Sequence, residues 1–209
     1  MTGTIKNWSI EFPPRAGGNM ADDRLSDDEK LILLRIARQA LESGVRGQKF
    51  PAVVLQSLPE RLQAQGASFV TLTRNGTLRG CIGALEPYQP LAQDVCEHAL
   101  AAALQDYRFP VVCEEELPQI AIEVSRLTAP CSLEYCSPED LLSKLRPGID
   151  GVVLRDGPRR ATFLPQVWEK LANPADFLDN LCYKMGASPD LWRLKHLDVF
   201  VYQVEEFHE

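Results

Sequence analysis

The 209-residue sequence lacks the features that mark several large classes of protein. No apolar run reaches the ~18 residues that a membrane span requires, and the N-terminus has no apolar segment of the kind that signal peptides carry. Lysine and arginine form no run, and the net charge of −7 disfavours nucleic acid, whose phosphates bind basic surfaces. We therefore expect a cytoplasmic protein that binds neither membranes nor nucleic acids.

Metal-binding motifs are missing as well. The six cysteines, at positions 81, 96, 113, 131, 136 and 182, include no C-x₂-C spacing, so neither a zinc ribbon nor an iron–sulfur cluster of the radical type is predicted. The three histidines, at positions 98, 196 and 208, are few and scattered. We expect free thiols in a reducing compartment, and neither a metal nor a cofactor.

The hexapeptide Leu-Arg-Gly-Cys-Ile-Gly at residues 78–83 is the most informative segment. It follows Asn75-Gly76, a pair that predicts a tight hairpin turn because both residues tolerate a positive φ. Glycine inside a strand marks a bulge, or a close approach by a ligand or another backbone. With Gly80 and Gly83 flanking a thiol, the segment has the composition expected of a binding or catalytic site.

The register of this hairpin decides which way the thiol faces. If the loop has two residues, counting outwards pairs Leu72 with Arg79 and Val70 with Cys81. Cys81 then shares a face with Val70 and Leu72, which favours a small buried thiol. The alternative is a nucleophilic thiolate stabilised by the neighbouring Arg79 guanidinium.

One histidine lies on a predicted helix that runs from Pro90 to about Asp106. Its apolar stripe includes Leu91, Val95, His98 and Ala102. A single histidine on such a stripe is most often a hydrogen-bonded core residue. The alternative is that the stripe packs beneath the hairpin and that His98 serves as the base for the thiol.

The segment Asp-Tyr-Arg-Phe-Pro at residues 106–110 ends that helix. In one interpretation it is a loop fixed by an Asp106–Arg108 ion pair, with its aromatic residues in the core. In the other, the planar fork of Arg108 clamps a carboxylate or phosphate. The ligand-binding set for a small anionic ligand is then Arg79, Gly80, Gly83, Asp106 and Arg108.

A carboxylate also lies within the predicted strand 120–127. Glu123 there needs a partner because an unpaired buried charge is unfavourable, and Arg79 or Arg108 is the expected one. The pair is either a structural ion pair or part of a polar site with Cys81. An enzyme built this way would use Cys81 as nucleophile, with Glu123 or His98 as acid or base.

The remaining pattern indicates an α+β fold. Capping signatures predict helices that start near Ser26, Ser57, Ser137 and Asn173. Asp156-Gly157 predicts a second hairpin, and the alternating residues 197–207 predict one long strand. Without a β-α-β-α rhythm, the sheet should be mainly antiparallel with flanking helices. Residues 1–24 are expected to be a mobile or loosely docked extension, and residues 25–209 the folded domain.

The hexapeptide resembles the hallmark of the AMMECR family, which is named for the Alport syndrome, midface hypoplasia and elliptocytosis chromosomal region. Residues 106–110, 122–125 and 163–167 are also similar to the family, and the resemblance covers about residues 26–207. It implies a cytosolic α+β protein of two subdomains packed as one unit. It also implies similarity to protein A of the bacterial AmmeMemoRadiSam system, whose other members are a Memo-type protein and a radical S-adenosylmethionine enzyme.

The resemblance implies no particular reaction, so two hypotheses follow. The first is a binding or assembly subunit that acts with Memo-type and radical S-adenosylmethionine partners through a recess around residues 78–83. The second is an enzyme that uses the Cys81 thiol. The absence of a metal motif, of a phosphate-binding glycine loop and of a recognisable triad favours the first.

Overall fold

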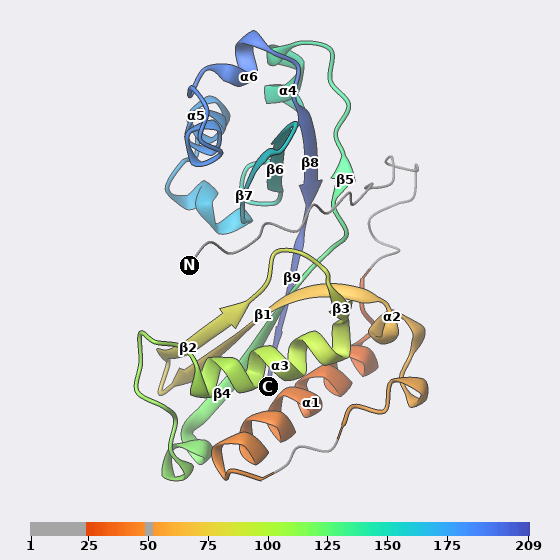
Figure 1. Cartoon of the computed structure of the whole chain (residues 1–209), viewed down its shortest axis with the longest axis vertical. Coiled ribbons are helices and arrows are strands. Elements are labelled where there is room, and N and C mark those ends of the chain that lie inside the picture. The colour runs from red at the N-terminus through yellow and green to blue at the C-terminus, as the bar shows by residue number, and fades with distance from the viewer. Residues whose placement is uncertain (1–23, 49–51) are drawn as a thin grey trace. The chain divides into compact units, whose positions relative to one another are not determined.

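The structure, a computed structural model, describes residues 24–48 and 52–209. The chain divides into two units, each with its own hydrophobic core (Figure 1). The larger unit contains residues 24–129 and the last six residues, 204–209, and the inserted unit contains residues 130–203. The predicted N-terminal extension lies, apart from Arg24, outside the described residues.

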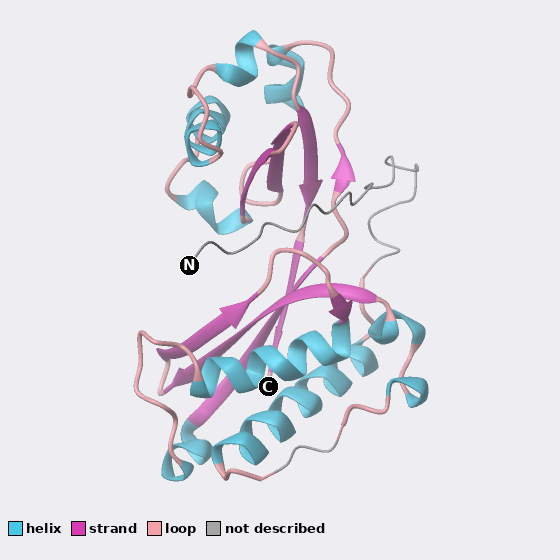
Figure 2. Cartoon of the chain, in the orientation of Figure 1, coloured by secondary structure: helices cyan, strands magenta, loops and turns pink. Residues whose placement is uncertain are grey.

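The larger unit is an antiparallel sheet with helices on one face (Figure 2). The strand order is β2-β1-β4-β9, and the short strand β3 pairs with the start of β1. Its elements are α1 (Asp27–Val45), η2 (Leu55–Ser57), α2 (Glu60–Gln63), β1 (Gln65–Arg74), β2 (Thr77–Gly83), β3 (Gln89–Pro90), α3 (Leu91–Leu104), η3 (Glu114–Gln119), β4 (Ile120–Leu127) and β9 (Val204–His208).

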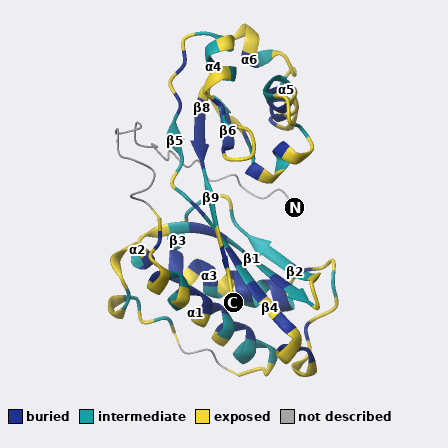
Figure 3. Cartoon of the chain, turned by 180° about the vertical axis from the view of Figure 1, so that it is seen from behind, coloured by how far each residue is buried: buried dark blue, intermediate teal, exposed yellow. Residues whose placement is uncertain are grey.

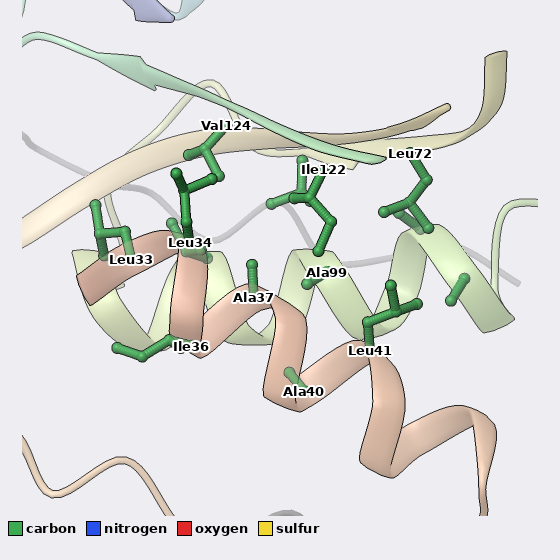
Figure 4. Packing of buried hydrophobic residues seen from close by; sticks show 14 of the residues in the cluster. Leu33, Leu34, Ile36, Ala37, Ala40, Leu41, Leu72, Ala99, Ile122 and Val124 are labelled. Atoms are coloured by element: carbon green, nitrogen blue, oxygen red, sulfur yellow. The ribbon is translucent and has the colours of Figure 1, made fainter. Parts of the chain in front are cut away.

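Helices α1 and α3 cover the same face of this sheet. Leu34 and Leu41 of α1 point toward Leu72, Ile122 and Val124 of the sheet (Figure 4). Complete burial of a leucine or isoleucine side chain contributes roughly 1.5–3 kcal/mol, so this layer is the main source of the unit's stability. Residues of β1 and β4 that alternate with these are half-buried or exposed from Phe69 to Thr73 and from Ala121 to Ser125, and α1 and α3 do not cover this other face (Figure 3). Further along the same face, Ala67 and Leu127, which pair with each other, are buried. We call this face the open face.

Helix α1 begins where its capping signature predicts. The Glu29 backbone amide donates to the Ser26 side chain at 3.2 Å, and the Ser26 amide donates to the Glu29 carboxylate at 2.8 Å. This reciprocal pair satisfies two amides that a helix start leaves free. The Ser137 and Asn173 caps are also confirmed, at the starts of the two longer helices of the inserted unit. There each side chain accepts one hydrogen bond from a backbone amide of the first turn.

The inserted unit has a four-stranded antiparallel sheet of order β5-β8-β6-β7. Its core includes Trp168 stacked on Phe177, with ring centroids 3.7 Å apart. Its elements are β5 (Cys131–Ser132), α4 (Pro138–Lys144), β6 (Gly151–Asp156), β7 (Arg159–Phe163), η4 (Pro165–Glu169), α5 (Pro174–Lys184), α6 (Leu191–Leu194) and β8 (Asp198–Tyr202).

The α+β class with mainly antiparallel sheets is confirmed, whereas two predicted elements are wrong. The single strand expected over 197–207 is divided at Gln203 into β8 and β9, which belong to different sheets. An alternating pattern gives the period of a strand but not the sheet that it joins. Ser57 caps no helix, since the short α2 starts after Pro59. Within the described ranges, no helix is both long and apolar enough for a membrane span.

Candidate functional site

The hairpin that carries the hexapeptide contains a bulge. Next to the Asn75-Gly76 turn, where both residues have positive φ, Thr73 pairs with Leu78 as a two-residue loop requires. Beyond that point the register shifts by one residue, so Leu72 pairs with Gly80 and Arg79 is the extra residue. The predicted pairs of Leu72 with Arg79 and of Val70 with Cys81 are therefore wrong.

The shift moves Cys81 to the open face. Its register partner is Thr71 rather than Val70, so it points away from the helices. Cys81 is half-buried and is not a member of the core cluster. The Thr71 hydroxyl donates to the Cys81 sulfur at 3.4 Å. The bulge thus places a hydrogen-bonded thiol on the face that the helices leave uncovered.

Cys81 belongs to a polar row that crosses four strands. Thr71 pairs with Cys81 on one side and with Glu123 on the other, and Glu123 pairs with His208. We call Cys81, Thr71, Glu123 and His208 the Cys81 row. Because adjacent strands are nearly 5 Å apart, the backbones of Cys81 and Glu123 are separated by about 10 Å. The structure brings two of the three predicted catalytic residues, Cys81 and Glu123, onto one face without direct contact.

Asp106 and Arg108 together hold the backbone of Cys81. The Cys81 amide donates to Asp106 Oδ2 at 2.8 Å, and Arg108 Nη2 donates to the Cys81 carbonyl at 2.9 Å. Since β2 is at the edge of the sheet, these two side chains take the place of a neighbouring strand. Arg108 also binds the Asp106 carboxylate through Nε and Nη2, at 2.9 and 2.7 Å.

This ion pair shifts the pKa of both partners. Hydrogen bonds from Arg108 hold the pKa of the Asp106 carboxyl well below its ordinary value, and the contact with Asp106 raises the pKa of the guanidinium. The predicted Asp106–Arg108 pair is confirmed. The expectation that the aromatic residues of this segment lie in the core is wrong, since Tyr107 is 95% exposed and Phe109 is half-buried.

The side chain of Arg79 leaves the hairpin at the bulge and binds Glu116. Nε and Nη2 donate to the two carboxylate oxygens at 2.9 and 2.8 Å, and Nη1 donates to the Pro110 carbonyl at 2.8 Å. Arg74 donates to the same carboxylate at 3.0 Å. The hydrogen bonds from Arg79 lower the pKa of Glu116 to about 2.

Glu116 was not found by reasoning from the sequence. It lies in a run of three glutamates, and nothing in that run distinguishes the one that turns inward. The ion pair expected between Glu123 and Arg79 or Arg108 is wrong, because both arginines bind other carboxylates. Glu123 stays half-buried on the open face.

The two glycines of the hexapeptide lie against other parts of the chain. A Cβ at Gly80 would lie 2.2 Å from the Ala102 carbonyl oxygen of α3. A Cβ at Gly83 would lie 2.4 Å from the Phe69 ring and 2.5 Å from the Ser68 carbonyl oxygen. The close approaches that the glycines predicted are therefore made by the protein itself. A role of either glycine toward a ligand stays a prediction.

His98 lies on the helix-covered side of the sheet and not beside Cys81. Its Nδ1 is 3.1 Å from Asp94 Oδ2, and the Ser68 hydroxyl donates to that oxygen at 2.6 Å. Ser68 and Asp94 are fully buried and His98 is nearly so. His98 is thus a hydrogen-bonded core residue, separated from the thiol by the thickness of the sheet. In the part of the chain that the structure describes, no three His, Cys, Asp or Glu side chains are placed to hold a metal ion.

Comparisons with known proteins agree on one family. The family model AMMECR1 matches residues 34–207. A protein from Methanothermobacter thermautotrophicus is 42% identical over 186 residues, which cover 88% of this chain and 96% of the relative. One from Methanocaldococcus jannaschii is 35% identical over 188 residues, covering 88% and 92%. The crystal structure of an uncharacterised protein from Pyrococcus horikoshii is similar, with a TM-score of 0.69, 33% identity and coverage of 88% and 93%.

Proposed function

The chain belongs to the AMMECR1 family, as the hexapeptide predicted, and we propose that it is a binding or assembly subunit whose open face receives a partner. One observation carries the proposal. Arg79 binds Glu116 and the Pro110 carbonyl, whereas Asp106 and Arg108 bind one another and the backbone of Cys81. These contacts therefore fix the shape of this edge of the sheet. The guanidinium groups of Arg79 and Arg108 each use a pair of N–H donors for a carboxylate of the protein itself, so those donors are not available to a substrate.

The proposed partners are a Memo-type protein and a radical S-adenosylmethionine enzyme. The bacterial system to which the family resemblance points supports this choice. The open face is suited to a macromolecular contact because it is the side of a sheet and holds half-buried groups, among them Phe69, Thr71 and Cys81. A small anionic ligand is the weaker form of the proposal, since Arg79 and Arg108 already bind Glu116 and Asp106. We place the protein in the cytoplasm, where its six free thiols are compatible with the reducing conditions.

The proposal can be tested by calorimetric titration of the chain with purified Memo-type and radical S-adenosylmethionine proteins from the same organism. Thr71→Arg and Glu123→Lys place a large or oppositely charged side chain on the open face. Each is expected to weaken binding by about ten-fold or more. The matched control is Arg35→Glu on the exposed side of α1.

Circular dichroism and thermal unfolding would show that each variant remains folded. Equal affinities for the wild type and the two open-face variants would contradict the use of this face. The absence of measurable binding to either protein would contradict the assignment of the partners.

A second candidate function, thiol chemistry at Cys81, is favoured by the hydrogen bond from Thr71 to a half-buried sulfur. It is tested by alkylation of all six cysteines over a range of pH, read by peptide mass spectrometry. Labelling of Cys81 faster than the exposed Cys136 at pH 6–7 would support a reactive thiolate. If Cys81 reacts only after unfolding, thiol chemistry is contradicted. The position of His98 leaves Glu123 as the acid or base on the same face.

A further inference from the structure

The loop at residues 106–111, which we call the Tyr107 loop, is fixed at both ends and in its middle. The Phe109 amide donates to the Asp106 carbonyl at 3.1 Å, and the Val112 amide donates to the Ala103 carbonyl at 3.0 Å. Arg79 binds the Pro110 carbonyl at 2.8 Å. With the Asp106–Arg108 pair on the Cys81 backbone, these bonds hold the loop along the outer edge of β2.

This fixed loop nevertheless presents apolar side chains to solvent. Tyr107 is 95% exposed and Val111 60% exposed, and Leu78 on the adjoining strand is 42% exposed. Within the described ranges, no hydrogen bond, ring stacking or cation–π contact involves the Tyr107 side chain. Folding therefore gains little from a tyrosine at this position. Tyrosine beside arginine in a rigid setting is the composition of residues that dominate binding energy at protein interfaces.

The ion pair next to these side chains has its cation on the outside. The Arg108 side chain is 45% exposed, whereas the side chain of its partner Asp106 is 2% exposed. Arg108 uses Nε and Nη2 for its bonds to Asp106 and the Cys81 carbonyl, its side chain also interacts with the Cys81 thiol, and Nη1 takes no part in the bonds to Asp106 or to the carbonyl. The loop thus presents N–H donors of a cation beside two apolar groups. A carboxylate is the complementary group.

We propose that the Tyr107 loop is a docking site for an acidic segment of a partner protein, in which an apolar side chain lies next to Asp or Glu. The apolar side chain packs on Tyr107 and Val111, and the carboxylate accepts from Arg108 Nη1. Since the loop is already ordered, little conformational entropy is lost on binding. This inference rests on the proposed binding function and specifies the chemistry of the partner at the edge of the open face.

The test uses a phage-displayed library of random dodecapeptides, selected on the full-length protein. Enriched peptides are expected to contain Leu, Phe or Trp within three residues of Asp or Glu. Their affinity for Tyr107→Ser should fall by about thirty-fold, the loss typical of a central interface tyrosine. Replacement of the acidic residue of the peptide by Asn or Gln should weaken binding by about ten-fold or more. Thermal unfolding of Tyr107→Ser should match the wild type, because the side chain is 95% exposed and makes no hydrogen bond or ring contact within the described ranges.

Three results would overturn the inference. The first is enriched peptides that bind Tyr107→Ser as tightly as the wild type. The second is affinity that does not change when the acidic residue of the peptide is neutralised. The third is a library that yields no enriched peptide. Peptides that lose binding to Thr71→Arg but not to Tyr107→Ser would refute docking at the loop while supporting the open face, so failure of this inference is distinguishable from failure of the proposed function.

Discussion

The Asp106 carboxylate accepts a hydrogen bond of 2.8 Å from the backbone amide of Cys81, which lies 25 residues earlier in the sequence. The contact joins the two segments that carry the family resemblance, because the hexapeptide supplies the amide and the 106–110 segment supplies the carboxylate. Its physical role is to satisfy the outer edge of β2, which no strand in the described ranges covers. The position of the Cys81 backbone is thus set by side chains from another part of the fold.

Replacement of Asp106 by Asn should loosen this edge. The change removes the charge that Arg108 binds and weakens the acceptor for the Cys81 amide. We expect a loss of about 2 kcal/mol in the free energy of unfolding, as for other buried charge-assisted hydrogen bonds. Urea unfolding measures the loss, and hydrogen exchange should show faster exchange of the Cys81 amide.

The exposed Asp176 provides a matched control for this variant. Asp176→Asn should change the free energy of unfolding by less than about 0.5 kcal/mol. An Asp106→Asn variant with unaltered stability and unaltered exchange at Cys81 would show that the contact does not hold the strand.

Gly80 should not tolerate alanine. A Cβ there would lie 2.2 Å from the Ala102 carbonyl oxygen, which belongs to the α3 backbone and cannot rotate away. We expect Gly80→Ala to destabilise the protein by about 2–3 kcal/mol, the usual effect of overpacking, as measured by urea unfolding.

Gly44→Ala is the control, because its new Cβ would clash with the terminal methyl of the Leu100 side chain, at 2.0 Å, and would lie at ordinary contact distance, 3.5 Å, from Leu104. That methyl can move, and alanine is favoured over glycine within a helix by up to about 1 kcal/mol. We therefore expect Gly44→Ala to have a clearly higher free energy of unfolding than Gly80→Ala. The reverse order would refute the packing role of Gly80.

Local signals in the sequence were sufficient for much of the fold. The capping box of Ser26 and Glu29 depends on two residues that are three positions apart. The alternation of buried and more exposed residues in β4 depends only on the sequence of that strand. The Asn75-Gly76 turn was also predicted, because its backbone conformation is a property of those two residues.

The glycines of the hexapeptide were compatible with a bulge in β2, but its position and its effect on the register could not be predicted in this way. The extra residue at the bulge, Arg79, binds Glu116, which lies 37 residues away. A shift of one residue in the register decides whether Cys81 faces the core or the open face. The local sequence pattern does not reveal this shift, so it could not place Cys81 on the open face. For the same reason the predicted pair of Glu123 with Arg79 or Arg108 is wrong.

Glu116 should contribute to stability only above acidic pH. Its folded pKa of about 2 lies below the ordinary value of 4.5, so the unfolded chain takes up the proton first as the pH falls. The stabilisation is complete above about pH 5 and is lost as the pH falls toward 2. We expect Glu116→Gln to reduce the difference in unfolding free energy between pH 6 and pH 2.5 by about 1 kcal/mol, allowing for screening by solvent.

Urea unfolding at a series of pH values measures this slope. Glu114→Gln is the control, because Glu114 lies in the same run but is exposed. Its acid slope should match that of the wild type. Parallel slopes for all three proteins would show that the Arg79–Glu116 pair is not linked to folding.

Two exposed thiols, Cys113 and Cys136, should differ in reactivity. Hydrogen bonds with Glu115 and then Glu116 raise the pKa of Cys113, because the carboxylates disfavour its thiolate. Since alkylation requires the thiolate, Cys113 should react several-fold more slowly than Cys136 at pH 7.5, and the difference should shrink toward about pH 10. Glu115→Gln should accelerate Cys113 and leave Cys136 unchanged, as measured by iodoacetamide labelling and peptide mass spectrometry. Equal rates at both cysteines at pH 7.5 would mean that the carboxylates do not suppress the Cys113 thiolate.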